Sequence, residues 1–109
     1  MNNSFKNGSV KIANETIEFI ARSSAEEVYG VYAAEEGHVE KDKLTQAKLN
    51  FTDTGLEISL NVVLVKNVEV RKTVKKIQER VKKQIEVMTG IAVKRVNVSV
   101  EKLLILWPG

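Results

Sequence analysis

Residues 46–64 alternate between apolar and polar side chains on both sides of a short turn, and this pattern restricts the possible folds more than any other feature. Gly55 closes the turn Asp53-Thr54-Gly55, where a short hairpin loop needs a positive φ. The pattern predicts two antiparallel strands with one apolar face, which the rest of the chain has to cover with a second layer. The apolar set is Ala47, Leu49, Phe51, Leu56, Ile58, Leu60, Val62 and Leu64.

An amphipathic helix is predicted upstream of the hairpin, after a short strand at residues 9–12. Asn14 can cap its first turn, and Gly30 lies where a left-handed residue is expected to end it. Residues 31–33 then form a second short strand in this interpretation. The apolar face of the helix is rich in small residues, which let a helix lie close to a sheet: Ile17, Ile20, Ala21, Ser24, Ala25 and Val28.

A longer helix is predicted over residues 68–88, with Asn67 as its cap and Gly90 at its end, followed by a last strand at residues 93–100. The predicted fold is a two-layer α+β domain. Its mainly antiparallel sheet carries two helices on one face, in the order β-α-β-β-β-α-β. We expect one domain over residues 1–109, with a core at about 8–101 and an apolar tail at 102–109. The apolar stripe of the longer helix is Val70, Val74, Ile77, Val81, Ile85 and Met88.

The sequence holds few residues that carry chemistry. It has no cysteine, and therefore no disulfide, thiolate ligand or thiol nucleophile. Its one histidine, His38, lies in the polar loop 34–43 beside four acidic residues, which is a weak basis for a metal site. No nucleotide-binding glycine motif is present, and no apolar run reaches the ~18 residues of a membrane span. We therefore expect a soluble protein that is not an enzyme, with no catalytic residue, cofactor, metal or small-molecule substrate.

The charge of the chain is unevenly divided. Residues 1–65 hold 6 Lys/Arg and 10 Asp/Glu, a net −4, whereas residues 66–109 hold 11 and 4, a net +7. This division favours an acidic partner for the C-terminal half, or contact between unlike faces of two copies; an ordinary solvated helix surface is the alternative. On the longer helix, Lys72, Lys76 and Lys83 form the solvent-facing strip that we expect to meet an acidic surface.

Apolar side chains outside the expected core are further candidates for partner contact. Phe19 projects from the first helix away from its apolar face, although solitary exposed aromatic residues are common. The alternation of the last strand carries Leu103, Ile105 and Trp107 onto its polar side. Either a bulge near residues 101–102 turns this tail onto its own domain, or the three side chains form a docking strip.

Two blocks lie near the two ends of a span from residue 8 to residue 100, nearly the whole chain: GSVKIANETIEFIARSSAEEVYGV (8–31) and VKKIQERVKKQIEVMTGIAVKRVNVSV (74–100). In this order they resemble the alkaline shock protein twenty-three family, the envelope stress response proteins of Gram-positive bacteria. One departure is Val68, where relatives often start the helix with proline. The matching positions include Gly8, Val10, Ile12, Ala13, Ile20, Ala21, Ala25, Val28, Gly30, Val31, Gln78, Val81, Thr89, Gly90, Val93, Asn97 and Val98.

The resemblance implies a non-enzymatic, cytoplasmic interaction or scaffold protein of the cell-envelope (alkaline) stress response or envelope homeostasis. The partners it implies are other copies of the chain, in a homo-oligomer, and a membrane-anchored protein. Membrane association would then pass through that partner, and contact with the membrane itself would be indirect or peripheral. Because the matching residues are structural, the resemblance transfers no catalytic residue.

The basic second helix leaves one alternative from another class, a small RNA- or nucleic-acid-binding α+β domain. Modules that read RNA sequence use aromatic side chains on an exposed sheet face or a GXXG clamp. The chain has no GXXG, and the outer hairpin positions carry no aromatic residue, so we expect protein partners rather than nucleic acid. Those outer positions are Gln46, Lys48, Asn50, Glu57, Ser59 and Asn61.

Overall fold

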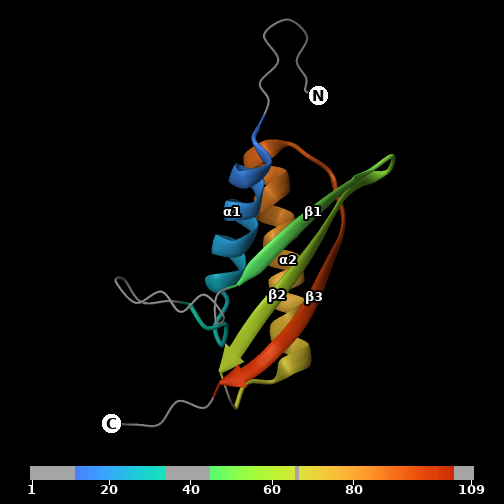
Figure 1. The fold of residues 1–109 in the computed structure, drawn as a ribbon. Coiled ribbons are helices and arrows are strands. Elements are labelled where there is room, and N and C mark those ends of the chain that lie inside the picture. The colour runs from blue at the N-terminus through green and yellow to red at the C-terminus, as the bar shows by residue number, and fades with distance from the viewer. Residues whose placement is uncertain (1–11, 34–44, 66, 105–109) are drawn as a thin grey trace, which may run out of the picture.

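Three strands form one sheet, and two helices lie side by side on one face of it (Figure 1). The computed structural model describes residues 12–33, 45–65 and 67–104. Its elements are α1 (Asn14–Glu26), β1 (Gln46–Thr52), β2 (Gly55–Val65), α2 (Val70–Thr89) and β3 (Val93–Leu104). The predicted α+β class is confirmed, with both helices on the same side of the sheet.

β1 and β2 form the antiparallel hairpin that the alternation predicts. Leu49 lies opposite Ile58 and Ala47 opposite Leu60, so the apolar side chains of both strands share one face. Gly55 has a φ of 140° at the turn, as a tight hairpin loop requires.

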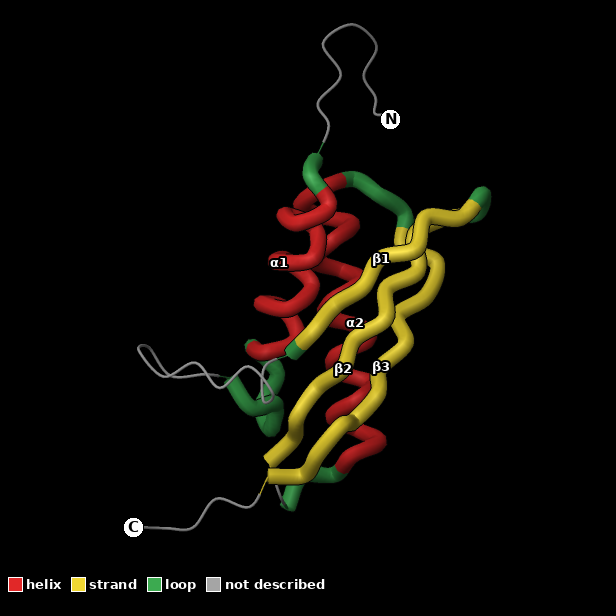
Figure 2. Tube along the Cα trace, in the orientation of Figure 1, coloured by secondary structure: helices red, strands yellow, loops and turns green. Residues whose placement is uncertain are grey.

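The predicted order β-α-β-β-β-α-β is wrong, because the described elements follow the order α-β-β-α-β. The sheet is also mixed rather than mainly antiparallel: β3 pairs with β2 in parallel, and the strand order is β1-β2-β3. The reason is the connection between these strands. α2 crosses the sheet face and returns the chain to the end where β2 began, so β3 runs in the same direction as β2 (Figure 2).

The two short strands predicted around α1 have different outcomes. Residues 9–12 lie outside the described residues, apart from Ile12. In the segment 31–33, Val31 forms only an isolated bridge with Leu64. This segment is nevertheless tied to β2, because the Tyr32 N–H donates to the Val63 carbonyl and the Val65 N–H to the Gly30 carbonyl, each at 2.8 Å.

The core lies between the helices and the inner face of the sheet. The predicted face of α1 is buried throughout, and Ala21 and Ala25 are fully buried, which lets this helix approach its neighbours closely. On α2 the observed stripe is shorter than predicted, since Met88 is 61% exposed. α2 has 20 residues and α1 has 13, so the ends of α2 extend about 10 Å in total beyond its neighbour. The buried residues of α2 are Thr73, Ile77, Val81 and Ile85.

The predicted helix caps were wrong, whereas both glycine conformations were right. The N-caps are Ala13 and Glu69, and neither side chain accepts a capping hydrogen bond from a backbone N–H of its helix. Asn67 instead adopts a φ of 78°, a conformation that asparagine tolerates better than most residues. Gly90 ends α2 with a φ of 75°. Gly30 has a φ of 98° but lies in the turn beyond α1, which ends at Glu26.

Side chains of α2 bind backbone groups of β3. Gln78 Nε2 donates to the Val96 carbonyl at 3.0 Å, and the Val93 N–H donates to Glu86 Oε2 at 2.9 Å. β3 has β2 as its only strand neighbour in the described sheet, and a free edge of this kind invites pairing with other chains. The two side chains therefore protect the first half of this strand.

Candidate functional site

A shallow groove runs between the end of α1 and the outer surface of α2, and we call it the helix groove. Its volume is about 440 Å³, and it is open to solvent along one side. The groove is lined by Glu27, Val28, Tyr29, Lys76, Glu79, Arg80, Lys83 and Gln84.

The turn after α1 builds one wall of the groove. Two hydrogen bonds join this turn to the last residues of α1: the Glu27 N–H donates to the Ser23 carbonyl and the Val28 N–H to the Ala25 carbonyl, both at 3.1 Å. Val28 continues the apolar period of α1 and is buried, so the next side chain, Tyr29, points outward and is 89% exposed. An exposed tyrosine next to cationic side chains offers an aromatic surface together with a hydrogen-bonding hydroxyl.

The turn is held against α2 by one ion pair. Arg80 donates from Nε at 2.8 Å and from Nη2 at 2.6 Å to Oε1 of Glu27. Both side chains are about half exposed, so this contact adds little to stability, on the order of 0–1 kcal/mol. Its consequence is local: it fixes the position of the turn and neutralises one cation of the groove. Lys76 and Lys83 remain without an ion pair among the described residues.

The structure separates the three lysines that the sequence grouped. Lys76 and Lys83 both line the helix groove, whereas Lys72 lies outside it and is paired with Glu69 at 3.0 Å. Phe19 is 61% exposed on α1 and does not line the groove. Tyr29 and Arg80 were missed as candidates. Tyr29 could have been found, because the residue after the last core position of a helix must point away from the core.

A bulge, one of the two alternatives predicted for the tail, is present in β3. Val100 pairs with Val62 and Lys102 pairs with Val63, so Glu101 is the extra residue of β3. The bulge brings Leu103 into register with Leu64, whose side chain is fully buried, yet Leu103 itself is 53% exposed. Ile105 and Trp107 lie outside the described residues, so the docking strip remains a prediction.

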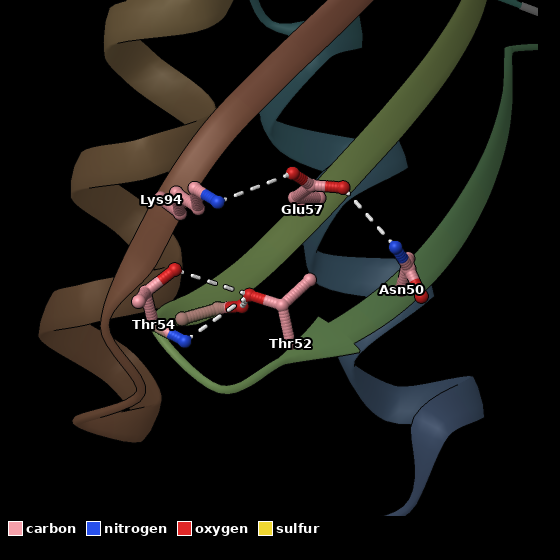
Figure 3. Close-up of polar contacts among 6 residues, drawn as sticks. Asn50, Thr52, Thr54, Glu57 and Lys94 are labelled. Carbon is pink, nitrogen blue, oxygen red and sulfur yellow. Dashed lines mark hydrogen bonds and ion pairs between the residues drawn. The ribbon is translucent and has the colours of Figure 1, made fainter.

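A second polar cluster lies on the sheet face away from the helices, at the hairpin end (Figure 3). Asn50 Nδ2 donates to Glu57 Oε1 at 3.1 Å, and Lys94 Nζ lies 3.8 Å from Glu57 Oε2, so three strands are joined through one carboxylate. In the turn, Thr52 Oγ1 donates to the Gly55 carbonyl at 2.6 Å. These groups bind one another, so we assign the cluster a structural role.

The described residues contain no cluster of metal-ligating side chains. No group of three His, Cys, Asp or Glu side chains in the described ranges could hold a metal ion, and His38 lies outside those ranges. Burial raises the pKa of the Glu26 carboxyl, and its contacts with Thr45 and Arg22 oppose this rise without cancelling it. Neither α1 nor α2 is long and apolar enough to cross a bilayer.

Residues 2–105 match the sequence model of the alkaline shock protein 23 family. This family is described as having a cell envelope-related function. The chain belongs to this family. This result confirms the resemblance of the two sequence blocks, and it assigns the chain to a family whose function concerns the cell envelope.

This member of the family is similar to a curated protein in sequence and to a solved structure in fold. An uncharacterised protein of Streptococcus pyogenes serotype M6, Spy1614, is 27% identical over 111 residues, which cover 93% of this chain and 92% of that protein. A solved MamM-CTD structure aligns with a TM-score of 0.50 at 16% identity, over 83% of this chain and 98% of that one. The structural likeness concerns the fold alone.

Proposed function

We propose that this family member is a non-enzymatic interaction or scaffold protein of the cell envelope, which acts from the cytoplasm in envelope homeostasis or the response to alkaline stress. Its partners in this proposal are other copies of the chain and a membrane-anchored protein. The helix groove is the binding site that we assign to a protein partner.

The observation that carries the proposal is the composition of the helix groove. Tyr29 is almost fully exposed beside Lys76 and Lys83, which have no ion pair among the described residues. Tyrosine is among the residues that most often dominate binding energy at interfaces, and cations at the rim select acidic partners. The groove therefore fits a protein segment that combines an apolar or aromatic side chain with carboxylates.

The test is capture by the immobilised chain from cytoplasmic and membrane fractions of the cells that express it. The groove variant combines Tyr29→Ser, Lys76→Glu and Lys83→Glu. The control is Lys48→Glu, which reverses one exposed lysine on β1 on the opposite face of the sheet. We expect the groove variant to lose at least about tenfold in partner recovery, and the control to retain it.

Two outcomes would contradict the assignment. If both variants recover the same proteins in the same amounts as the unmodified chain, the groove is not the site. If nothing specific is recovered, and sizing chromatography at high concentration gives only monomer, the chain is not an interaction protein of this kind. Circular dichroism of each variant establishes that the fold is retained.

A further inference from the structure

α2 carries a second cationic surface, which the helix groove does not include. Arg71, Lys75 and Lys82 are all exposed, and we call them the α2 row. Together with Gln78 they follow one another at intervals of four, three and four residues, which is the spacing of one helix face.

Hydrogen bonds show which way the α2 row faces. Gln78, in the middle of the row, donates to the Val96 carbonyl and so places this side of α2 along β3. Arg80 bonds to Glu27 and so places the groove side of α2 against the end of α1. The α2 row and the helix groove therefore lie on different sides of the same helix.

The cations of the α2 row have no partner within the described part of the chain. No ion pair or hydrogen bond joins the side chain of Arg71, Lys75 or Lys82 to any described residue, whereas the side chains of Lys72 and Arg80 are both paired. Neither Glu79 nor Glu86 of α2 forms an ion pair with the row. Glu86 accepts the N–H of Val93, and Glu79 lines the groove.

The shape of this surface fits a flat anionic partner. From Arg71 to Lys82 the row extends about 16 Å along the helix, and a helix ridge presents such a line to a plane without any pocket. Val70 and Leu103 are exposed where α2 begins and β3 ends, at the same end of the domain (Figure 1). Lysine and arginine side chains near a membrane are attracted by the negative surface potential of its anionic lipids.

We propose that the α2 row is a docking surface for the anionic phospholipid headgroups of a membrane. This goes beyond the proposed function, in which membrane contact passes through a protein partner, and it does not depend on the helix groove. Each basic residue near an anionic lipid surface strengthens binding by about fivefold, so three together give on the order of a hundredfold.

Nucleic acid is the competing polyanion, and the sheet argues against it. The outer face carries polar side chains such as Lys48, Asn50 and Asn97, and none of the outward side chains of β1 and β3 in the described range is aromatic. Single-stranded nucleic acid is bound mainly by stacking on aromatic side chains.

The experiment is cosedimentation of the full chain with phosphatidylcholine vesicles that do or do not contain phosphatidylglycerol, at low and at high salt. The row variant combines Arg71→Glu, Lys75→Glu and Lys82→Glu. A charge-matched control on the same helix combines Lys72→Glu, Lys76→Glu and Lys83→Glu. All six side chains are exposed, so both variants should fold, and their thermal melts verify this.

We expect the unmodified chain to bind only the vesicles that contain phosphatidylglycerol, and more weakly at high salt. The row variant should lose at least a hundredfold in binding, whereas the control, which has the same net charge, should keep most of it because its α2 row is intact. Equal losses in the two variants, or no binding by the unmodified chain, would overturn the proposal. The proposal would also be overturned if, at equal ionic strength, the unmodified chain bound a mixed-sequence oligonucleotide more tightly than the anionic vesicles and the row variant lost that binding. The control variant lacks two lysines of the helix groove and keeps the α2 row. Vesicle binding by this variant therefore tests the α2 row independently of the helix groove.

Discussion

Gly30 and Gly90 both have a positive φ, but their surroundings differ. The same substitution, glycine to alanine, should therefore reduce stability by different amounts at the two positions. At Gly30 the φ is 98°, and an added Cβ would lie 2.6 Å from Cγ1 of Val68. At Gly90 the φ is 75°, and an added Cβ would meet no heavy atom within 4 Å. Replacement by alanine therefore adds backbone strain alone at Gly90, and strain plus steric overlap at Gly30.

The expected costs follow from these contacts. A left-handed backbone costs a residue with a Cβ about 1–2 kcal/mol, so Gly90→Ala should lower the free energy of unfolding by about 1 kcal/mol. Overpacking of a close contact adds about 1–3 kcal/mol, so Gly30→Ala should cost about 2–4 kcal/mol. For a domain of this size, 1 kcal/mol corresponds to a Tm change of about 4–8 °C.

Urea unfolding followed by circular dichroism measures both free energies, and Val68→Ala completes the test. Removing the Val68 methyl groups relieves the overlap. The loss of unfolding free energy in the double variant Gly30→Ala, Val68→Ala should therefore be smaller than the sum of the two single losses, by about 1 kcal/mol or more. Equal losses at the two glycines, or additive losses in the double variant, would refute the packing of the turn after α1 against Val68.

Three further predictions concern single side chains. Gln78→Leu should cost about 0.5–1.5 kcal/mol in urea unfolding, because the Val96 carbonyl loses its donor, and should increase aggregation measured by light scattering; unchanged values would contradict the protective role. Burial raises the folded-state pKa of Glu26, so stability is lost as pH rises through that pKa. Glu26→Gln should therefore raise Tm at pH 7 with a gain that disappears below pH 4.5, and a gain independent of pH would contradict this. Phe19→Ala should change the free energy of unfolding by less than about 0.5 kcal/mol while weakening self-association in sizing chromatography, and a large loss of stability would place Phe19 in the core.

Local patterns were enough to predict much of this domain. The alternation over residues 46–64 depends only on which neighbours share a face of a strand, and the hairpin and its register follow from it. The small apolar face of α1 follows in the same way from the helical period, and so does the exposure of Phe19. The positive φ of Gly90 was predictable because a helix end has few alternatives to glycine.

Part of the candidate site was also accessible from the sequence. Lys76 and Lys83 were predicted as solvent-facing, since the helical period alone assigns them to the side opposite the core, and both line the helix groove. Their relation to Lys72 was not accessible. Whether a lysine is paired with a neighbour such as Glu69 depends on rotamers and on where the helix begins, and the predicted helix began two residues too early.

The amino-acid sequence by itself determined the two amphipathic helices, the hairpin and the uneven distribution of charge, because each depends on residues close together in the chain. Only the tertiary structure decided the direction of β3, since α2 had to cross the sheet before β3 could pair with β2. The helix groove also forms only in the tertiary structure, because its two walls are joined by the ion pair between Arg80 and Glu27, which are 53 residues apart in the chain. The same holds for the α2 row, because the bond from Gln78 to Val96 orients α2 on the sheet. Contacts over such separations depend on how the layers pack, and no local period encodes them.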